Sequence, residues 1–343
     1  MKNRRSVIIT TFGAALAAFA LATSGAGHPA FAEEQSIAGV LSGPLGDLSF
    51  MDSANAGFKK ITSGLNIPVR VLEGNTSDAP GWERNLTQIS STGQYGLIIA
   101  GSTQISSTLK KVSAQFPDQK YVIFDNATVG PNVTGIAFAQ NEGAFLAGAL
   151  AALVTDHPDL FPRAKGSKKV GVIGGKDIPV IRDFIIGFEQ GAKAVDPSIA
   201  VDIRFTDDFG NAQKGFDVAT AMFNDGVDVI YQVAGGSGIG ILKAGQTSGR
   251  YTIGTDTDQS PLQPESVVGS ALKDVGAAVF NAAEAFSKGE LKPGTTLISD
   301  LKSKGVDFVV NPKLTPDSIT GELDTYRQKV VSGEIKVNSA FNK

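Results

Sequence analysis

Cysteine is absent from all 343 residues of the chain, and histidine occurs only twice. The chain therefore forms no disulfide, no thiolate metal site and no thiolate nucleophile, and it offers no cysteine on which a lipid could be carried. His28 falls in an N-terminal leader described below, which leaves His157 alone in a polar segment. A single histidine cannot build a His-rich metal site or a Ser-His-Asp triad, so we expect neither a metal site nor a catalytic site.

Nucleotide-cofactor and hydrolase motifs are missing as well. The glycine-rich run at 235–240 fails the Gly-x-Ser-x-Gly pattern at Ile239 and the Gly-x-Gly-x-x-Gly pattern at Ile241, and no phosphate loop occurs. Asp256 and Asp258 could in principle act as a glycosidase pair, but two residues apart at a strand end they point to opposite sides. We expect no cofactor and a binding protein, with an exported hydrolase as the disfavoured alternative.

The first 32 residues have the features of a secretory signal peptide. Lys2, Arg4 and Arg5 precede an uncharged apolar run over residues 7–22, and the segment ends in Ala-Phe-Ala at 30–32. This pattern predicts cleavage before Glu33, and the apolar run is short for a membrane anchor. An exported chain without disulfides or a lipid anchor fits a bacterial periplasm.

Positive charge is scarce in the rest of the chain. Once the leader is removed, 28 Lys and Arg face 34 Asp and Glu, a net charge of −6. This balance argues against a nucleic-acid partner and against an anionic membrane surface.

Short apolar strands alternate with amphipathic helical stretches along the chain. Strands are predicted at 36–41, 69–73, 96–100, 121–125, 133–138, 170–174, 200–205, 227–233, 252–255, 267–272 and 306–310. Such alternation predicts right-handed βαβ units and parallel sheets covered by helices on both faces. The fold class is therefore α/β, with two doubly wound units.

The order of the elements predicts two lobes that exchange segments. We assign residues 33–138 plus 257–305 to an N-terminal lobe and residues 139–256 plus 306–343 to a C-terminal lobe. The chain then crosses between the lobes three times, and the crossings form a hinge.

Two strand ends near residue 235 and residue 256 predict a ligand crevice. Gly235 lies in a glycine-rich turn that lets backbone approach a ligand, and Ser237 is expected to cap the next helix. Asp256 places a hydrogen-bond acceptor at the tip of the following strand. The carboxyl ends of parallel strands are where open sheets bind ligands.

Each predicted lobe also supplies an aromatic residue after a strand. Asp47 and Phe50 follow the first strand, and Phe209 follows the strand at 200–205. Two phenyl rings from opposite lobes can clamp a flat heterocycle once the lobes close, while Asp47 accepts hydroxyl hydrogens. Core packing is the alternative for each Phe.

Three further residues stand at strand ends. Lys273 can reach a hydroxyl or neutralise the acidic groups, and a solvated lysine is its alternative. Asp125 and Asn126 are weaker candidates at the end of another strand.

At these residues the sequence resembles the basic membrane protein family, the solute-binding subunits of ABC importers that include bacterial purine nucleoside receptors. The motifs are Gly-Asp-Leu-Ser-Phe at 46–50, Glu-Gly-Ala-Phe-Leu-Ala-Gly at 142–148, Ala-Gly-Gly-Ser-Gly at 234–238, Ile-Gly-Thr-Asp-Thr-Asp-Gln at 253–259 and Ser-Ala-Leu-Lys at 270–273. The resemblance implies a type I periplasmic-binding fold, a monomer, and an ABC permease in the inner membrane as partner.

The resemblance also implies roles for individual residues. Phe50 and Phe209 would sandwich a base, and Asp47, Asp256 and Lys273 would hold ribose hydroxyls. The chain departs from the nucleoside-binding pattern at Gly46, Met51 and Asn211, which leaves the solute open among a nucleoside, a free base, a flavin and a sugar-like ligand. A sensing protein that feeds a membrane receptor is the alternative to transport.

Overall fold

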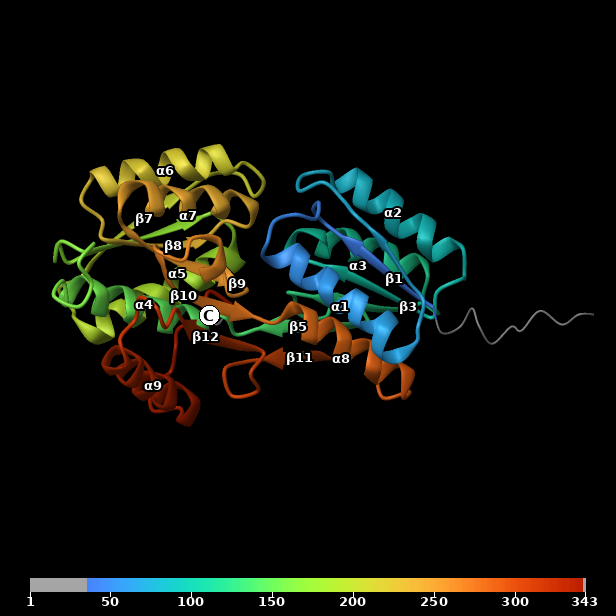
Figure 1. Cartoon of the computed structure of the whole chain (residues 1–343). Helices are drawn as coiled ribbons and strands as arrows, with labels where there is room; N and C mark the ends of the chain where they lie inside the picture. Colours follow the sequence, from blue (N-terminus) through green and yellow to red (C-terminus); the bar gives the residue numbers. More distant parts are fainter. Residues whose placement is uncertain (1–35, 342–343) are drawn as a thin grey trace, which may run out of the picture.

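The computed structural model describes residues 36–341, which form two lobes lying side by side (Figure 1). Each lobe is built on one six-stranded sheet, and most strand pairs are parallel. The predicted signal peptide lies outside the described residues. Within the described part of the chain, no helix has both the length and the apolar character needed to cross a bilayer.

The sheet of the first lobe has the strand order β11-β5-β4-β3-β1-β2, and all its pairs are parallel. Its strands are β1 (Ile37–Leu41), β2 (Val69–Leu72), β3 (Leu97–Gly101), β4 (Lys120–Phe124), β5 (Val133–Phe138) and β11 (Thr296–Ser299). Strands β1 and β3 are buried along their whole length. Parallel strands covered on both faces have this continuous apolar character.

Helices cover both faces of the first sheet. The pair α1 (Phe50–Leu65) and α8 (Val275–Ser287) lies on one face, and the pair α2 (Ala79–Ser91) and α3 (Ser106–Gln115) lies on the other. Successive residues of β1 alternate between the two cores: Ile37 packs with α1, and Ala38 packs with α2 and α3. The short 3-10 helix η1 (Thr103–Ile105) links β3 to α3.

The second sheet has the order β12-β10-β9-β8-β6-β7. Its strands are β6 (Lys169–Gly174), β7 (Ala200–Phe205), β8 (Val229–Val233), β9 (Tyr251–Asp256), β10 (Val267–Lys273) and the antiparallel edge strand β12 (Val306–Val310). Its helices are α4 (Gln140–Asp156), α5 (Pro179–Val195) and α9 (Asp317–Ser332) on one face and α6 (Ala212–Asn224) and α7 (Gly236–Ser248) on the other. The 3-10 helix η2 (Ser260–Leu262) follows β9.

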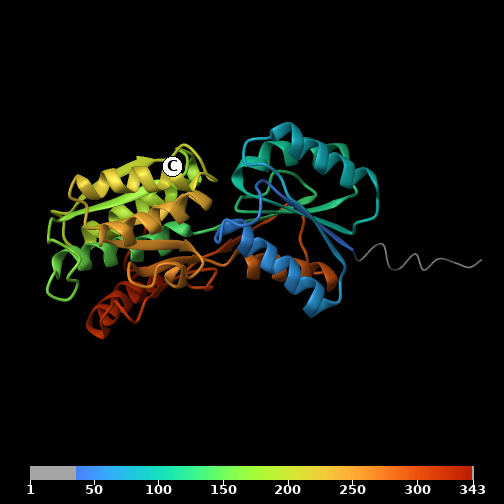
Figure 2. The ribbon, with the colours of Figure 1, turned by 45° about the horizontal axis from the view of Figure 1, so that its top comes forward.

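The chain passes between the lobes three times, after β5, after β10 and after β11. This is the number of crossings that the sequence predicts. The strands next to these crossings lie at one edge of each sheet, and Figure 2 shows them converging between the lobes. The prediction that residues 257–305 belong to the first lobe is wrong for residues 257–273. Strand β10 pairs with β9 and β12, so it belongs to the second sheet, and the chain leaves that sheet only after Lys273.

Candidate functional site

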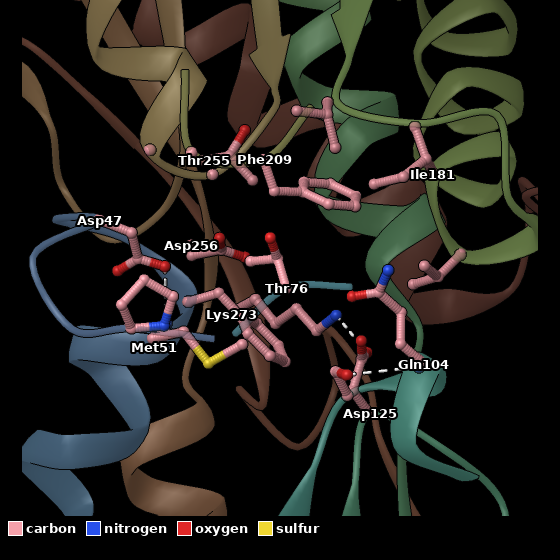
Figure 3. Close-up of a pocket in the computed structure, with 18 of the residues that line it drawn as sticks. Asp47, Met51, Thr76, Gln104, Asp125, Ile181, Phe209, Thr255, Asp256 and Lys273 are labelled. Carbon is pink, nitrogen blue, oxygen red and sulfur yellow. Dashed lines mark hydrogen bonds and ion pairs between the residues drawn. The ribbon is translucent and has the colours of Figure 1, made fainter. Parts of the chain in front are cut away.

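A cavity of about 300 Å³ lies between the carboxyl ends of the two sheets. Side chains of both lobes line it, and much of its wall is apolar (Figure 3). Among the lining residues are seven of the predicted site residues: Asp47, Phe50, Asp125, Phe209, Gly235, Asp256 and Lys273. Asn126 is not among them; its backbone N–H donates to the Ile136 carbonyl at 3.1 Å and bridges the chain to β5.

Asp47 lies at the N-terminal end of α1. Its carboxylate accepts hydrogen bonds from the backbone N–H groups of Ser49 (3.0 Å), Met51 (2.8 Å) and Asp52 (3.1 Å). These amides and the helix dipole favour the ionised form, but burial outweighs them and raises the pKa of Asp47. The carboxylate is therefore held in one orientation beside the cavity by backbone alone.

Asp256 ends β9 and enters the cavity from the second lobe. Its backbone has a positive φ of 68°, a conformation that Asp tolerates better than most residues. The hydroxyl of Ser49, from the first lobe, donates to one carboxylate oxygen. Burial raises the pKa of Asp256 to about 6, against the opposing effects of Lys273 and Ser49. Because Asp47 and Asp256 both bond to Ser49, the two carboxylates meet at one corner of the cavity.

Lys273, the last residue of β10, is almost fully buried at the base of the cavity. Its ammonium donates to the carboxylate of Asp125, which follows β4 in the first lobe (Figure 3). The ammonium also lies 5.2 Å, 5.1 Å and 5.3 Å from the ring centres of Phe50, Phe138 and Phe184. Burial raises the pKa of Asp125 although Lys273 opposes the rise. The pair is desolvated, and the phenyl faces add cation–π attraction.

The two candidate clamp residues come from opposite walls. Phe50 begins α1 and its ring lies 5.7 Å from that of Phe124. Phe209 lies in the connection between β7 and α6, and its ring packs on Gly175, where a Cβ would lie only 2.3 Å away. Both rings are half-buried and line the cavity, so each keeps surface that a ligand can cover.

Gly235 has the backbone conformation that its predicted role requires. Its φ of 54° and ψ of −131° suit glycine, and a Cβ there would lie 3.3 Å from the carbonyl oxygen of Phe209. Ser237 does not cap α7 as predicted. Its hydroxyl accepts from the Asn211 N–H and donates to the Asp208 carbonyl, so it holds the loop that carries Phe209.

The lobes touch on both sides of the cavity. Near the crossings, the side-chain amide of Gln259 donates to the Leu48 carbonyl at 3.1 Å. Near the sheet edges that lie away from the crossings, the Lys176 ammonium donates to the Ser77 hydroxyl at 3.0 Å. Hydrogen bonds between the lobes therefore border the cavity on two sides.

Sequence reasoning missed several lining residues. Gln104 extends from η1 into the cavity, and Thr76 and Ile181 also line it (Figure 3). Gln104 follows β3 in a Gly-Ser-Thr-Gln turn, the same strand-end signal that indicated Asp47 and Phe209. The apolar α5 residues carried no such signal, because they resemble ordinary core positions.

Asp258 lies away from this cavity, although it is only two residues from Asp256. It is exposed and lines a separate hollow between α1, α8 and η2. The predicted divergence of the two carboxylates therefore agrees with their positions. Across residues 36–341, no three histidine, aspartate or glutamate side chains come together to hold a metal ion.

Comparison with known proteins places the chain in a family. The profile of the Bmp family, described as ABC transporter substrate-binding protein PnrA-like, matches residues 34–340. Basic membrane protein A1 of Borrelia garinii subsp. bavariensis is 32% identical over 311 residues, covering 89% of this chain and 88% of its own. A protein of Lactococcus lactis subsp. cremoris named ABC transporter nucleoside-binding protein BmpA is 32% identical over 267 residues, covering 71% of this chain and 72% of its own.

A solved structure agrees with the sequence comparison. The solute-binding protein of an ABC transporter system from Aeropyrum pernix K1 superposes with a TM-score of 0.79 at 26% identity, covering 88% of this chain and 92% of that one. The two-lobed architecture is thus the type I periplasmic-binding fold that the sequence predicts. The chain belongs to the Bmp family of PnrA-like ABC transporter substrate-binding proteins.

Proposed function

We propose that this protein is the periplasmic receptor of an ABC importer and that it binds a purine nucleoside in the cavity between its lobes. It delivers the nucleoside to a permease in the inner membrane, acts as a monomer and carries no lipid anchor. Its role is binding and release, without chemical conversion of the solute.

The proposal rests on one observation: aromatic rings and carboxylates line the same cavity. Phe50 and Phe209 offer phenyl surface from opposite lobes, and stacking a base on an aromatic side chain contributes about 1–3 kcal/mol. Asp47 and Asp256 offer carboxylate oxygens at a shared corner, and each hydrogen bond from a sugar hydroxyl to a charged acceptor contributes about 1.5–3 kcal/mol. A nucleoside has a flat heterocycle that the phenyl rings can stack on and a sugar whose hydroxyls can donate to the carboxylates.

The size of the cavity favours a nucleoside over a flavin. Its volume of about 300 Å³ is at the small end of the range for ligand sites in proteins. A free base would leave the corner of Asp47 and Asp256 without donors, and a pentose would leave the phenyl rings uncovered. The name of the Lactococcus lactis relative supports the same ligand class.

A thermal-shift screen of the chain beginning at Glu33 tests the proposal. We expect purine nucleosides to raise the melting temperature, because a ligand at 100 times its Kd adds about 2.7 kcal/mol to stability. Free bases, ribose and riboflavin should raise it much less. A response to ribose or riboflavin alone would contradict nucleoside binding, and release of free base from a nucleoside would contradict a receptor without chemistry.

Cellular experiments separate transport from sensing and test the location. We expect the protein in the periplasmic fraction without a membrane anchor, and permease and ATPase genes beside its own gene. Loss of nucleoside uptake on deletion of the gene supports the importer role. Unchanged uptake together with a lost transcriptional response would favour the sensing role instead.

A further inference from the structure

The charges in the cavity do not balance. Four charged side chains line it: the carboxylates of Asp47, Asp125 and Asp256 and the ammonium of Lys273. Lys273 is bonded to Asp125, so that pair is neutral as a whole. Within residues 36–341, no ion pair involves Asp47 or Asp256. Two carboxylates therefore border the cavity without a basic side chain of their own.

The hydrogen-bond partners of these two carboxylates are all neutral. Asp47 accepts three backbone N–H groups, and Asp256 accepts the Ser49 hydroxyl on one oxygen. The other oxygen of Asp256, Oδ1, has no donor in the described part of the chain, although Asp256 is only 8% exposed and lines the cavity. The dipole of α1 supplies at most about half a positive charge, and Asp47 already receives it.

A cationic donor satisfies such a corner better than a neutral one. An ammonium group has three N–H donors and no acceptor, whereas a hydroxyl donates one hydrogen and brings lone pairs toward the carboxylates. A hydroxyl on a carboxylate already makes a strong hydrogen bond because the acceptor is charged, and an ammonium adds to it the attraction between opposite charges. Burial strengthens this difference, because the same carboxylates are poorly solvated without a ligand.

We propose that the corner formed by Asp47, Ser49 and Asp256 selects a sugar that carries a protonated amine, so that an aminonucleoside binds more tightly than the corresponding nucleoside. This inference rests on the proposed function, because it places the sugar of a nucleoside at that corner. It adds the chemical class of the preferred ligand: a nucleoside in which an ammonium group replaces one ribose hydroxyl.

Calorimetry with three matched sets of ligands tests the inference on the chain beginning at Glu33. The sets are adenosine; its 2′-amino-2′-deoxy and 3′-amino-3′-deoxy derivatives; and its 2′-deoxy and 3′-deoxy derivatives, with a guanosine series in parallel. At pH 7 we expect one of the amines to bind about 5-fold more tightly than the parent nucleoside, or better, and the deoxy compounds to bind more weakly than the parent. At pH 9 the advantage of the amine should shrink, because the amine loses its proton.

A pair of Asp→Asn substitutions assigns the effect to the corner. Asp256→Asn keeps the size of the side chain and removes its charge, so it should abolish the preference for the amine over the parent nucleoside. Asp258→Asn makes the same change two residues away, on an exposed side chain outside the cavity, and should leave the preference intact.

The outcomes separate this inference from the proposed function. If the parent nucleosides bind and both amines bind more weakly than they do, the inference is wrong and the proposed function stands. A preference for the amine that persists in the Asp256→Asn variant also overturns it. If no member of either series binds, the proposed function fails and the inference fails with it.

Discussion

Lys273 and Asp125 form a buried ion pair that joins the two lobes, because Lys273 ends a strand of the second sheet and Asp125 follows a strand of the first. The pair occupies the base of the cavity, where three phenyl rings exclude water from it. Its stability depends on both partners being present, since each charge compensates the burial of the other.

Replacing Lys273 with Met should destabilise the protein by about 3–5 kcal/mol, because the carboxylate of Asp125 is then buried without a cation. Urea denaturation measures the loss, and Lys243→Met, on an exposed side chain of α7, is the matched control. The double variant Lys273→Met, Asp125→Asn should recover part of the loss. A single variant as stable as the control would contradict the importance of the pair.

Asp256 should make stability depend on pH. Its pKa rises from an ordinary value of 3.8 to about 6 in the folded protein, so the folded state binds more protons than the unfolded state between these two values. Stability should therefore be highest below pH 4 as far as this group is concerned, and it should fall by about 3 kcal/mol as the pH rises through 6.

Asp256→Asn removes that dependence. Asn accepts the Ser49 hydrogen bond and tolerates the positive φ, so we expect the ligand-free variant to gain about 1–3 kcal/mol at pH 7.5. Urea titrations at pH 4.5 and 7.5, with Asp258→Asn as control, measure the change. An equal effect of the substitution at both pH values would count against a buried, titrating carboxylate.

Phe209→Ala should weaken nucleoside binding roughly 5- to 150-fold, the equivalent of losing one stacked ring. Binding of ribose, which has no base to stack, should change little. Phe280→Ala is the control, because Phe280 lies on α8 outside the cavity and packs against Lys60. Equal losses for nucleoside and ribose in calorimetric titrations would refute the clamp.

Gly57→Ala and Gly64→Ala, both in α1, should act in opposite directions. A Cβ on Gly57 would lie 2.5 Å from the Gly276 carbonyl oxygen of α8, so the helices must separate at a cost of about 1–3 kcal/mol. A Cβ on Gly64 would make an ordinary contact with Phe280 and should stabilise α1 by up to about 1 kcal/mol. Thermal unfolding of the two variants compares them, and a destabilised Gly64→Ala would show that space alone does not decide the sign.

Most of the fold could be predicted from the sequence because buried parallel strands are short, apolar and bounded by turns. Strands β5, β7 and β12 have the predicted bounds, and the others differ by one or two residues. Strand β11 was not predicted, because it has four residues and exposes Leu297 and Ile298 at the sheet edge. Strand β10 was assigned to the wrong lobe although it pairs with the preceding strand β9, because only the short 3-10 helix η2 separates the two strands and the usual strand–helix–strand alternation is interrupted there.

The candidate site could be predicted wherever a residue ends a strand or lies in the connection that follows one. Asp47, Phe209 and Asp256 satisfy that rule, and the cavity brings them together. Asn126 also follows a strand, but its backbone continues into a bridge with β5 and carries it away from the cavity. The three rings around Lys273 could not be foreseen, because Phe138 and Phe184 become its neighbours only when α5 packs beside the crossing strands.

The three passages of the chain between the lobes mean that neither half is a continuous stretch of polypeptide. The first sheet receives its last strand from residues 296–299, after five of the six strands of the second sheet have already been laid down in sequence. No single cut can release an intact half, and a chain emerging from the ribosome or from an export channel completes neither half until it is nearly whole.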